Sequence, residues 1–188
     1  MIHVGIDPGS VGAAVAMDDA DGSVVAAVHW NERRAWRLDV DDDGACWSLF
    51  ESPSMVGALR WFASAVNGAS IGDSLRLVVE AVTVNKGKGS PIALATSAGV
   101  AIGVVSAVCR VGSLHRPRPE GWRKVITGKA LAGRRGDLKA VAQAWASGRL
   151  HPGVDGMVLH PGGRVLPDGP DHPAEAALMA WASVRGVV

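Results

Sequence analysis

Residues 2–12, IHVGIDPGSVG, decide how this chain folds. The apolar run predicts a buried strand, which ends on one carboxylate, Asp7, before the chain turns at Pro8 and Gly9. A buried strand has little reason to carry an acid unless the acid binds something, because an unpaired buried charge is costly. An Asx turn at Asp7 is the purely structural alternative.

Two later acids have similarly apolar surroundings. Glu80 lies in the run LVVEAV, and Glu175 lies in DHPAEAAL. If the strands of Asp7 and Glu80 pair side by side, their carboxylates lie close together and repel one another without a cation. Together the three acids suggest a carboxylate site for a hard divalent metal ion.

The last helix adds further candidate ligands. Asp171 and Glu175 are spaced i,i+4, and His172 and Glu175 are spaced i,i+3, so Glu175 shares a helix face with each of them. Structural alternatives exist for all of these residues: Glu80 as an exposed residue of an edge strand, Asp171 as an N-cap, and Glu175 as a first-turn acid favoured by the helix dipole.

The pattern of apolar residues and turn signals predicts an α/β chain. A strand is followed by a β-hairpin, then helices and further strands alternate, and a glycine- and proline-rich loop precedes the last helix. Residues 31–52 could extend the hairpin into another edge strand. The predicted strands are 2–7, 12–17, 24–30, 75–82 and 110–115; the predicted helical segments are 54–67, 91–109, 119–126, 137–145 and 171–186; the long loop is 148–170.

Composition favours one domain spanning residues 1–188, because 48% hydrophobic residues supply an ample core. No apolar run of 18 residues lacks a charge, glycine or proline, so neither a membrane span nor a signal peptide is expected, and the expected location is cytoplasmic. Cys46 and Cys109 are far apart and without C-x-x-C spacing, which favours two reduced thiols.

The net charge of +1 hides an asymmetry. Residues 1–51 hold ten acids against three bases, whereas residues 110–139 hold nine bases against two acids. Such a basic segment can follow a phosphate backbone, although a solvated helix face would also be charged.

Four motifs in order resemble those of RuvC-type Holliday junction resolvases, most closely the phage-encoded branch. They are Ile6-Asp7-Pro8-Gly9 before a hairpin, Val79-Glu80, the segment PEGWRKVITG at 119–128 leading to Lys139, and Asp171-His172-Pro173-Ala174-Glu175-Ala176. The likeness spans nearly the whole chain, and the order of the motifs is more specific than any one of them.

The resemblance implies a ribonuclease H-like fold with a mixed five-stranded sheet flanked by helices, and a homodimer. It also implies two Mg²⁺ or Mn²⁺ ions held by Asp7, Glu80, Glu175 and either Asp171 or His172. The most familiar family pattern has two aspartates three apart on the last helix, whereas this chain has His172 and Glu175 there. His172 is therefore a candidate ligand or a candidate base for the attacking water, and Asp171 has the better oxygen chemistry for Mg²⁺.

The activity implied is hydrolysis of phosphodiesters in four-way DNA junctions to 5′-phosphate and 3′-hydroxyl ends. Lys139 resembles a family position near the active site. The family's aromatic wedge is missing, since Thr83 and Val84 stand there. The candidate phosphate contacts are Lys86, Lys88, Arg116, Arg118, Arg123, Lys124, Lys129, Arg134, Arg135 and Lys139.

Three other functions compete with a junction resolvase. A nuclease of the same fold could act on flaps, forks or other branched DNA. An actin-like sugar or acetate kinase would also place Asp7-Pro8-Gly9 at phosphate and metal, but it needs two such domains, for which 188 residues are too few. A DNA-binding protein with a decayed site would not be expected to keep four ligand positions.

Overall fold

The protein is described here by a computed structural model. The structure describes residues 1–31, 33–41, 44–50, 54–70, 72–82, 90–118, 122, 159–160, 164–165 and 172–188. Its main strands are β1 (Ile2–Asp7), β2 (Gly12–Asp18), β3 (Val24–Trp30), β4 (Ala35–Asp41), β5 (Gly44–Phe50), β6 (Leu75–Val79) and β7 (Val111–His115). Its helices are α1 (Met55–Ala69), α2 (Pro91–Val108) and α5 (His172–Val184).

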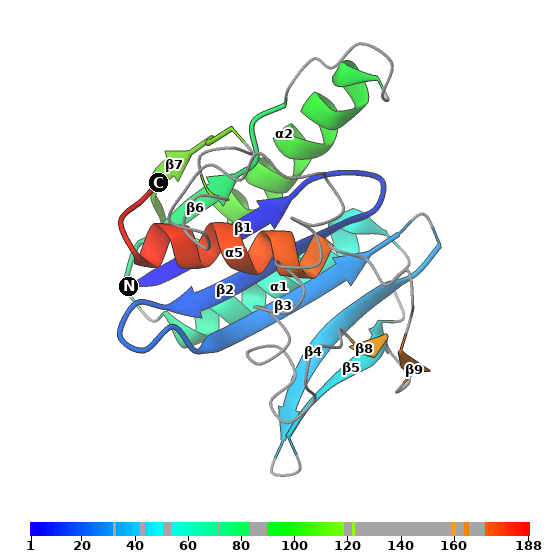
Figure 1. Ribbon diagram of the computed structural model, residues 1–188, viewed down its shortest axis with the longest axis horizontal. Coiled ribbons are helices and arrows are strands. Elements are labelled where there is room, and N and C mark those ends of the chain that lie inside the picture. The colour runs from blue at the N-terminus through cyan, green and yellow to red at the C-terminus, as the bar shows by residue number, and fades with distance from the viewer. Residues whose placement is uncertain are drawn as a thin grey trace, which may run out of the picture.

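The main sheet is mixed and has the strand order β5-β4-β3-β2-β1-β6-β7 (Figure 1). β1 pairs in parallel with β6, which pairs in parallel with β7, while β1 to β5 form an antiparallel meander. Within the core order β3-β2-β1-β6-β7, β2 alone runs opposite to β1. This strand order and these strand directions are those of a ribonuclease H-like fold, so the predicted fold class is confirmed.

The predicted number of five strands is wrong for the described residues, which form seven strands in this sheet. The additional pair is the β4–β5 hairpin, which continues the meander beyond β3. The segment 31–52, whose edge-strand character was left open by its sequence, supplies both strands. Part of the expected loop 148–170 also forms a short antiparallel pair, β8 (Leu159–His160) with β9 (Arg164–Val165).

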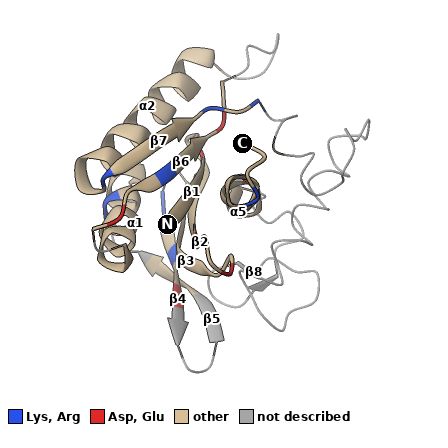
Figure 2. Cartoon of the chain, turned by 90° about the vertical axis from the view of Figure 1, so that its left-hand side faces the viewer, with Lys and Arg blue, Asp and Glu red and all other residues tan. Residues whose placement is uncertain are grey.

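Helices cover both faces of the main sheet. α1 and α2 pack on one face, and α5 crosses the other, as the edge-on view in Figure 2 makes plain. α1 begins where the sequence predicts, because the Ser54 side chain caps it by accepting a hydrogen bond from the Gly57 N–H at 3.1 Å. The predicted helices at 119–126 and 137–145 lie outside the described residues, apart from Trp122.

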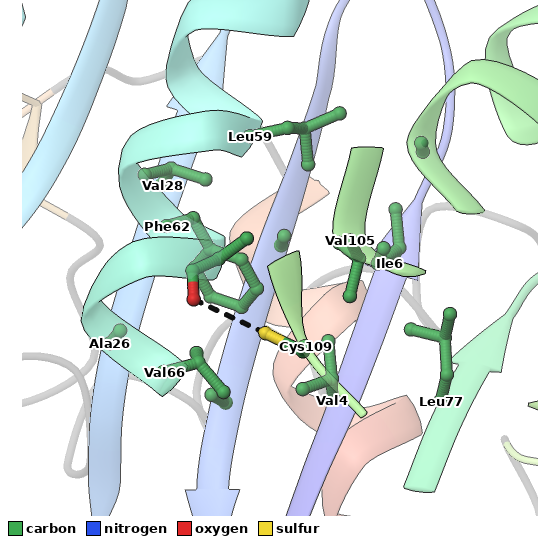
Figure 3. Close-up of a cluster of buried hydrophobic side chains, with 14 of the residues drawn as sticks. Val4, Ile6, Ala26, Val28, Leu59, Phe62, Val66, Leu77, Val105 and Cys109 are labelled. Carbon is green, nitrogen blue, oxygen red and sulfur yellow. Dashed lines mark hydrogen bonds between the residues drawn. The ribbon is translucent and has the colours of Figure 1, made fainter. Parts of the chain in front are cut away.

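Alternation along the strands divides the buried residues into two clusters. Val4 and Ile6 of β1 belong to the cluster under α1 and α2, in which the Cys109 thiol donates to the Ala63 carbonyl at 3.2 Å (Figure 3). The other cluster lies between the sheet and α5 and includes Trp122. Since successive strand residues point to opposite faces, Gly5 and Asp7 lie on the α5 face.

Gly5 lets α5 approach β1 closely. A Cβ atom at this position would lie 2.0 Å from the Ala176 carbonyl oxygen and 2.7 Å from the Ala180 nitrogen. The backbone of α5 thus rests directly on β1, two residues before Asp7. The helix residues one turn before Ala176, which include His172, therefore lie toward the end of β1 that carries Asp7.

The surface of α2 is unusually apolar. Only Ala98, Ala101 and Val105 of this helix are buried, and Ile92 is 78% exposed. Within the described part of the chain, α2 is the one helix long and apolar enough to cross a membrane, judged by length and composition alone. Its 18 residues contain no charge, although the sequence contains the glycine and proline interruptions noted above.

Candidate active site

Asp7 and Glu80 are neighbours at the carboxyl ends of two parallel strands. Ile6 of β1 pairs with Val79 of β6. Because the two strands are parallel, the residues that follow this pair, Asp7 and Glu80, are also neighbours. β6 ends at Val79, earlier than predicted, but the Glu80 N–H still donates to the Ile6 carbonyl at 3.3 Å. The predicted side-by-side placement of the two acid-bearing segments is therefore confirmed.

The first turn of α5 brings a third candidate to Asp7. The Nδ1 atom of His172 lies 2.5 Å from Oδ2 of Asp7. A carboxylate oxygen accepts, so Nδ1 carries the proton and donates, and the lone pair of a neutral ring is then on Nε2. His172 thus contacts Asp7 directly across 165 positions of sequence.

Glu175 lies one turn further along α5, in a stretch of the helix that is buried throughout. Glu175 is 8% exposed and Asp7 is 7% exposed, so both acids are buried. α5 contacts β1, β2 and β6, the strands around the acid pair. Burial of this kind is unusual for an acid whose only purpose is to favour the dipole at a helix start.

The loop that follows Asp7 is tied to β3. The fully buried Trp30 donates its Nε1–H to the Gly9 carbonyl at 3.0 Å. The Trp30 ring also fills the space beside Gly12, where a Cβ atom would lie 2.6 Å from the ring. Trp30 therefore holds both ends of the Pro8–Val11 loop in place, a role that the sequence pattern did not reveal.

Two exposed arginines lie near the acids. The Ala81 N–H, next to Glu80, donates to the Pro117 carbonyl at 2.9 Å, and Arg116 and Arg118 flank that proline. These two predicted phosphate contacts thus follow β7 at the same end of the sheet. The remaining basic candidates, Lys86, Lys88, Arg123, Lys124, Lys129, Arg134, Arg135 and Lys139, lie outside the described residues, as does Asp171.

The donor types suit a hard cation, because Asp7, Glu80 and Glu175 offer carboxylate oxygens and Mg²⁺ prefers oxygen ligands. Among the described residues, no group of three His, Cys, Asp or Glu side chains is close enough to hold one ion in the arrangement observed. In that arrangement, His172 hydrogen-bonds to an oxygen of Asp7 that a cation would use. The assignment of ligands stays a prediction.

Sequence reasoning missed two further residues beside His172. His29 of β3 is 4% exposed, and its ring stacks on Trp36 of β4 and on His172. Trp36 is 4% exposed, so its ring packs within the fold. His29 and Trp36 come to lie beside His172 through the register of the strand pairs, and register cannot be read from the sequence.

The class defined by this strand order is the ribonuclease H-like α/β fold. Among solved structures, the chain is similar to the Thermus thermophilus RuvC structure, with 16% identity, a TM-score of 0.48, and coverage of 100% of this chain and 98% of that one. It is also similar to T. thermophilus RuvC in complex with Holliday junction substrate, with 15% identity, a TM-score of 0.46, and coverage of 100% and 97%.

No protein-family model matches the sequence, and no curated protein sequence matches it significantly. At such identities, neither structural similarity assigns an activity to this chain, and the phage-like branch stays a prediction.

Proposed function

We propose that this protein is a metal-dependent endodeoxyribonuclease that resolves four-way DNA junctions, hydrolysing phosphodiesters to 5′-phosphate and 3′-hydroxyl ends. The observation that carries the proposal is the meeting of Asp7, the Glu80 segment and His172 at one end of the parallel strands. A buried carboxylate is costly unless it binds something, and the motif resemblance predicts these acids as the catalytic centre.

Mg²⁺ or Mn²⁺, in two sites, would be held by Asp7, Glu80 and Glu175 with Asp171 or His172 as a fourth ligand. Metal ions in such a site activate the attacking water and stabilise the leaving 3′ oxygen. The fold would set the relative positions of these ligands. The pairing of β1 with β6 sets the separation of Asp7 and Glu80, and the close packing of α5 on Gly5 sets the position of the ligands on the helix.

His172 has two possible functions that use the same atom. Since Nδ1 donates to Asp7, a neutral His172 presents Nε2 as its basic nitrogen. Nε2 would either accept the proton of the attacking water or bind metal, and Asp7 would orient the ring in both cases. His172→Ala with full Mg²⁺-dependent activity would contradict either function.

Arg116 and Arg118 would bind the DNA backbone beside the scissile phosphate. Both side chains are exposed, and the Ala81–Pro117 hydrogen bond ties their segment to that of Glu80. Arginine binds phosphate oxygens in a bidentate manner, which positions the backbone without reading bases. The basic candidates outside the described residues would extend this contact.

The partner in solution would be a second copy of the chain, bound through α2. Two symmetric nicks in one junction need two active sites related by a two-fold axis. α2 carries no charged residue, so a two-fold axis through it brings no like charges together. Gly99 and Gly103 have open space around them, which allows two such helices to pack closely.

The decisive experiment is incubation of a labelled four-way junction with Mg²⁺ and mapping of the cuts. Paired symmetric nicks with ligatable 5′-phosphates are expected. Unpaired cleavage of flaps, forks and plain duplex would point instead to the broader branched-DNA nuclease of the same fold. ATP hydrolysis without DNA would favour the kinase class.

Asp7→Asn tests the site itself. We expect junction cleavage to fall by more than about 100-fold while junction binding persists, since even outer-shell partners of a metal are worth roughly 10- to 100-fold. Asp73→Asn is the matched control, because Asp73 is an exposed acid preceding β6, at the other end of that strand. Equal cleavage by both variants would remove Asp7 from the catalytic centre.

A further inference from the structure

Four strands place one row of residues across the α5 face of the sheet. The cross-strand pairs are Asp7 with Ala13, Ala13 with His29, and His29 with Trp36. Directly paired residues point to the same face of a sheet, so all four side chains lie on the face that α5 covers. Ala13 is the smallest of the four and separates the acid from the two rings.

The His29 ring is fixed from two directions. Its Nδ1–H donates to the Gly12 carbonyl at 2.9 Å, which sets the tautomer because a carbonyl only accepts. On one side, His29 stacks with Trp36, with ring centroids 5.3 Å apart and an angle of 11° between the planes. A buried ring with one hydrogen bond and one stacked neighbour has little rotational freedom.

His172 stacks on the other side of His29 and so completes a row of three rings. Its ring is 6.4 Å from that of His29, centroid to centroid, and again only 11° from parallel. The same His172 ring donates a hydrogen bond from Nδ1 to Oδ2 of Asp7. His172 is therefore held edge-on by a carboxylate and face-on by an aromatic stack, and each contact restricts a different rotation of the ring.

We propose that His29 is a positioning residue, whose ring, anchored by Gly12 and backed by Trp36, sets the orientation of His172 against Asp7. The inference rests on the proposed function, because it gives His29 a role in the same site. His29 touches neither DNA nor metal in this proposal; it acts through His172. Offset-stacked rings at these separations attract one another and resist tilting.

The test compares His29→Leu with His29→Phe. Leucine fills the space without a ring, whereas phenylalanine keeps the stack and loses only the hydrogen bond to Gly12. Long-range ¹H–¹⁵N NMR of the histidine rings reports the Nδ1–H of His172 directly. We expect this signal to be lost in His29→Leu and retained in His29→Phe, in protein whose far-ultraviolet circular dichroism is unchanged.

The matched control is His3→Leu. His3 is also a buried strand histidine with a side-chain hydrogen bond, but it lies at the opposite end of β1. The His3→Leu substitution should leave the NMR signal of the His172 Nδ1–H unchanged. If His29→Leu does not fold, His29→Phe decides: loss of the His172 signal there overturns the proposed stacking role. An unchanged signal in folded His29→Leu, or its loss in His3→Leu, also overturns it.

Activity supplies a second readout that separates the two proposals. If the nuclease function holds, His29→Leu should lower kcat by roughly 10- to 100-fold with little change in KM, because a misplacement of about 1 Å can cost that much. An unchanged kcat overturns the role of His29 while leaving the nuclease function intact. If wild-type protein cleaves no DNA, the proposed function fails, and NMR still tests the orientation of His172.

Discussion

At the scale of single residues, the contact between Asp7 and His172 is the central observation at the candidate site. Each side chain alone has an ordinary structural explanation, an Asx turn or a solvated helix start. Their hydrogen bond, together with the burial of Asp7, assigns the proton to Nδ1 of His172. The sequence left open whether His172 is a metal ligand or a base. With the proton on Nδ1, both roles would use the same atom, Nε2.

A second histidine, His3, has a structural role at the opposite end of β1. Its Nδ1 lies 2.8 Å from Ser183 Oγ near the end of α5, and its Nε2 lies 3.2 Å from Asp19 after β2. Burial lowers the pKa of His3; Asp19 opposes this shift, while Arg76 and the N-terminus add to it. His3 therefore joins three elements while resisting protonation.

This shift predicts a loss of stability in weak acid. Because the pKa is lower in the folded than in the unfolded chain, the unfolded chain takes up the proton first, and the free energy of unfolding falls as the pH drops through about 6.5. Urea unfolding between pH 8 and pH 5 measures this effect. His3→Leu should have a flatter pH dependence than wild type; equal slopes would contradict the assignment.

At the scale of secondary structure, the packing of α5 on β1 aligns the two halves of the site. Gly5→Ala should lower the free energy of unfolding by roughly 3 kcal/mol, because the new methyl group meets backbone atoms of α5 that cannot rotate away. Denaturant unfolding checks this value. Junction cleavage should fall as well, since His172 and Glu175 move with the helix.

Gly68→Ala is the control for this substitution. Gly68 lies in the last turn of α1 with nothing within 4 Å of a new Cβ atom, so alanine should stabilise the protein by up to about 1 kcal/mol. A Gly5→Ala variant as stable as Gly68→Ala would mean that α5 does not rest on β1 as described.

At the scale of the whole molecule, α2 is the predicted surface of self-association. Ile92→Asp should convert a dimer to the 19.4 kDa monomer, because each copy would bring a charge to the two-fold axis. Sedimentation equilibrium measures the mass. Leu49→Asp, at a site 61% exposed on β5, should leave the mass unchanged. A monomeric wild type, or wild type that binds lipid vesicles through α2, would contradict the dimer.

DNA binding also belongs to the whole molecule, since it sums many phosphate contacts. Replacing Arg116 and Arg118 together by glutamine should make the log–log dependence of junction affinity on salt shallower by about 0.9 for each lost contact. Titrations at several salt concentrations give the slope. Arg60→Gln, on the exposed surface of α1, should not change it; an equal change in both variants would contradict a local phosphate site.

The sequence by itself determined the strand that ends at Asp7, the turn after it, the start of α1 and the order of the acids, because these depend on apolar periodicity and on residues close together in the chain. It also indicated the fold class. It overestimated the length of β6, because the apolar run at 75–82 continues past Val79, the last residue of that strand. It also missed the β4–β5 hairpin as two full strands, because charged residues interrupt the apolar pattern of residues 31–52.

Only the tertiary structure decided which side chains meet. The row from Asp7 to Trp36 depends on the registers of three strand pairs, and the position of His172 depends on how closely Gly5 lets α5 approach. Periodicity reports which face of an element is buried, but it does not report which residues lie opposite one another across that face. For that physical reason His29 could be found only in the folded chain.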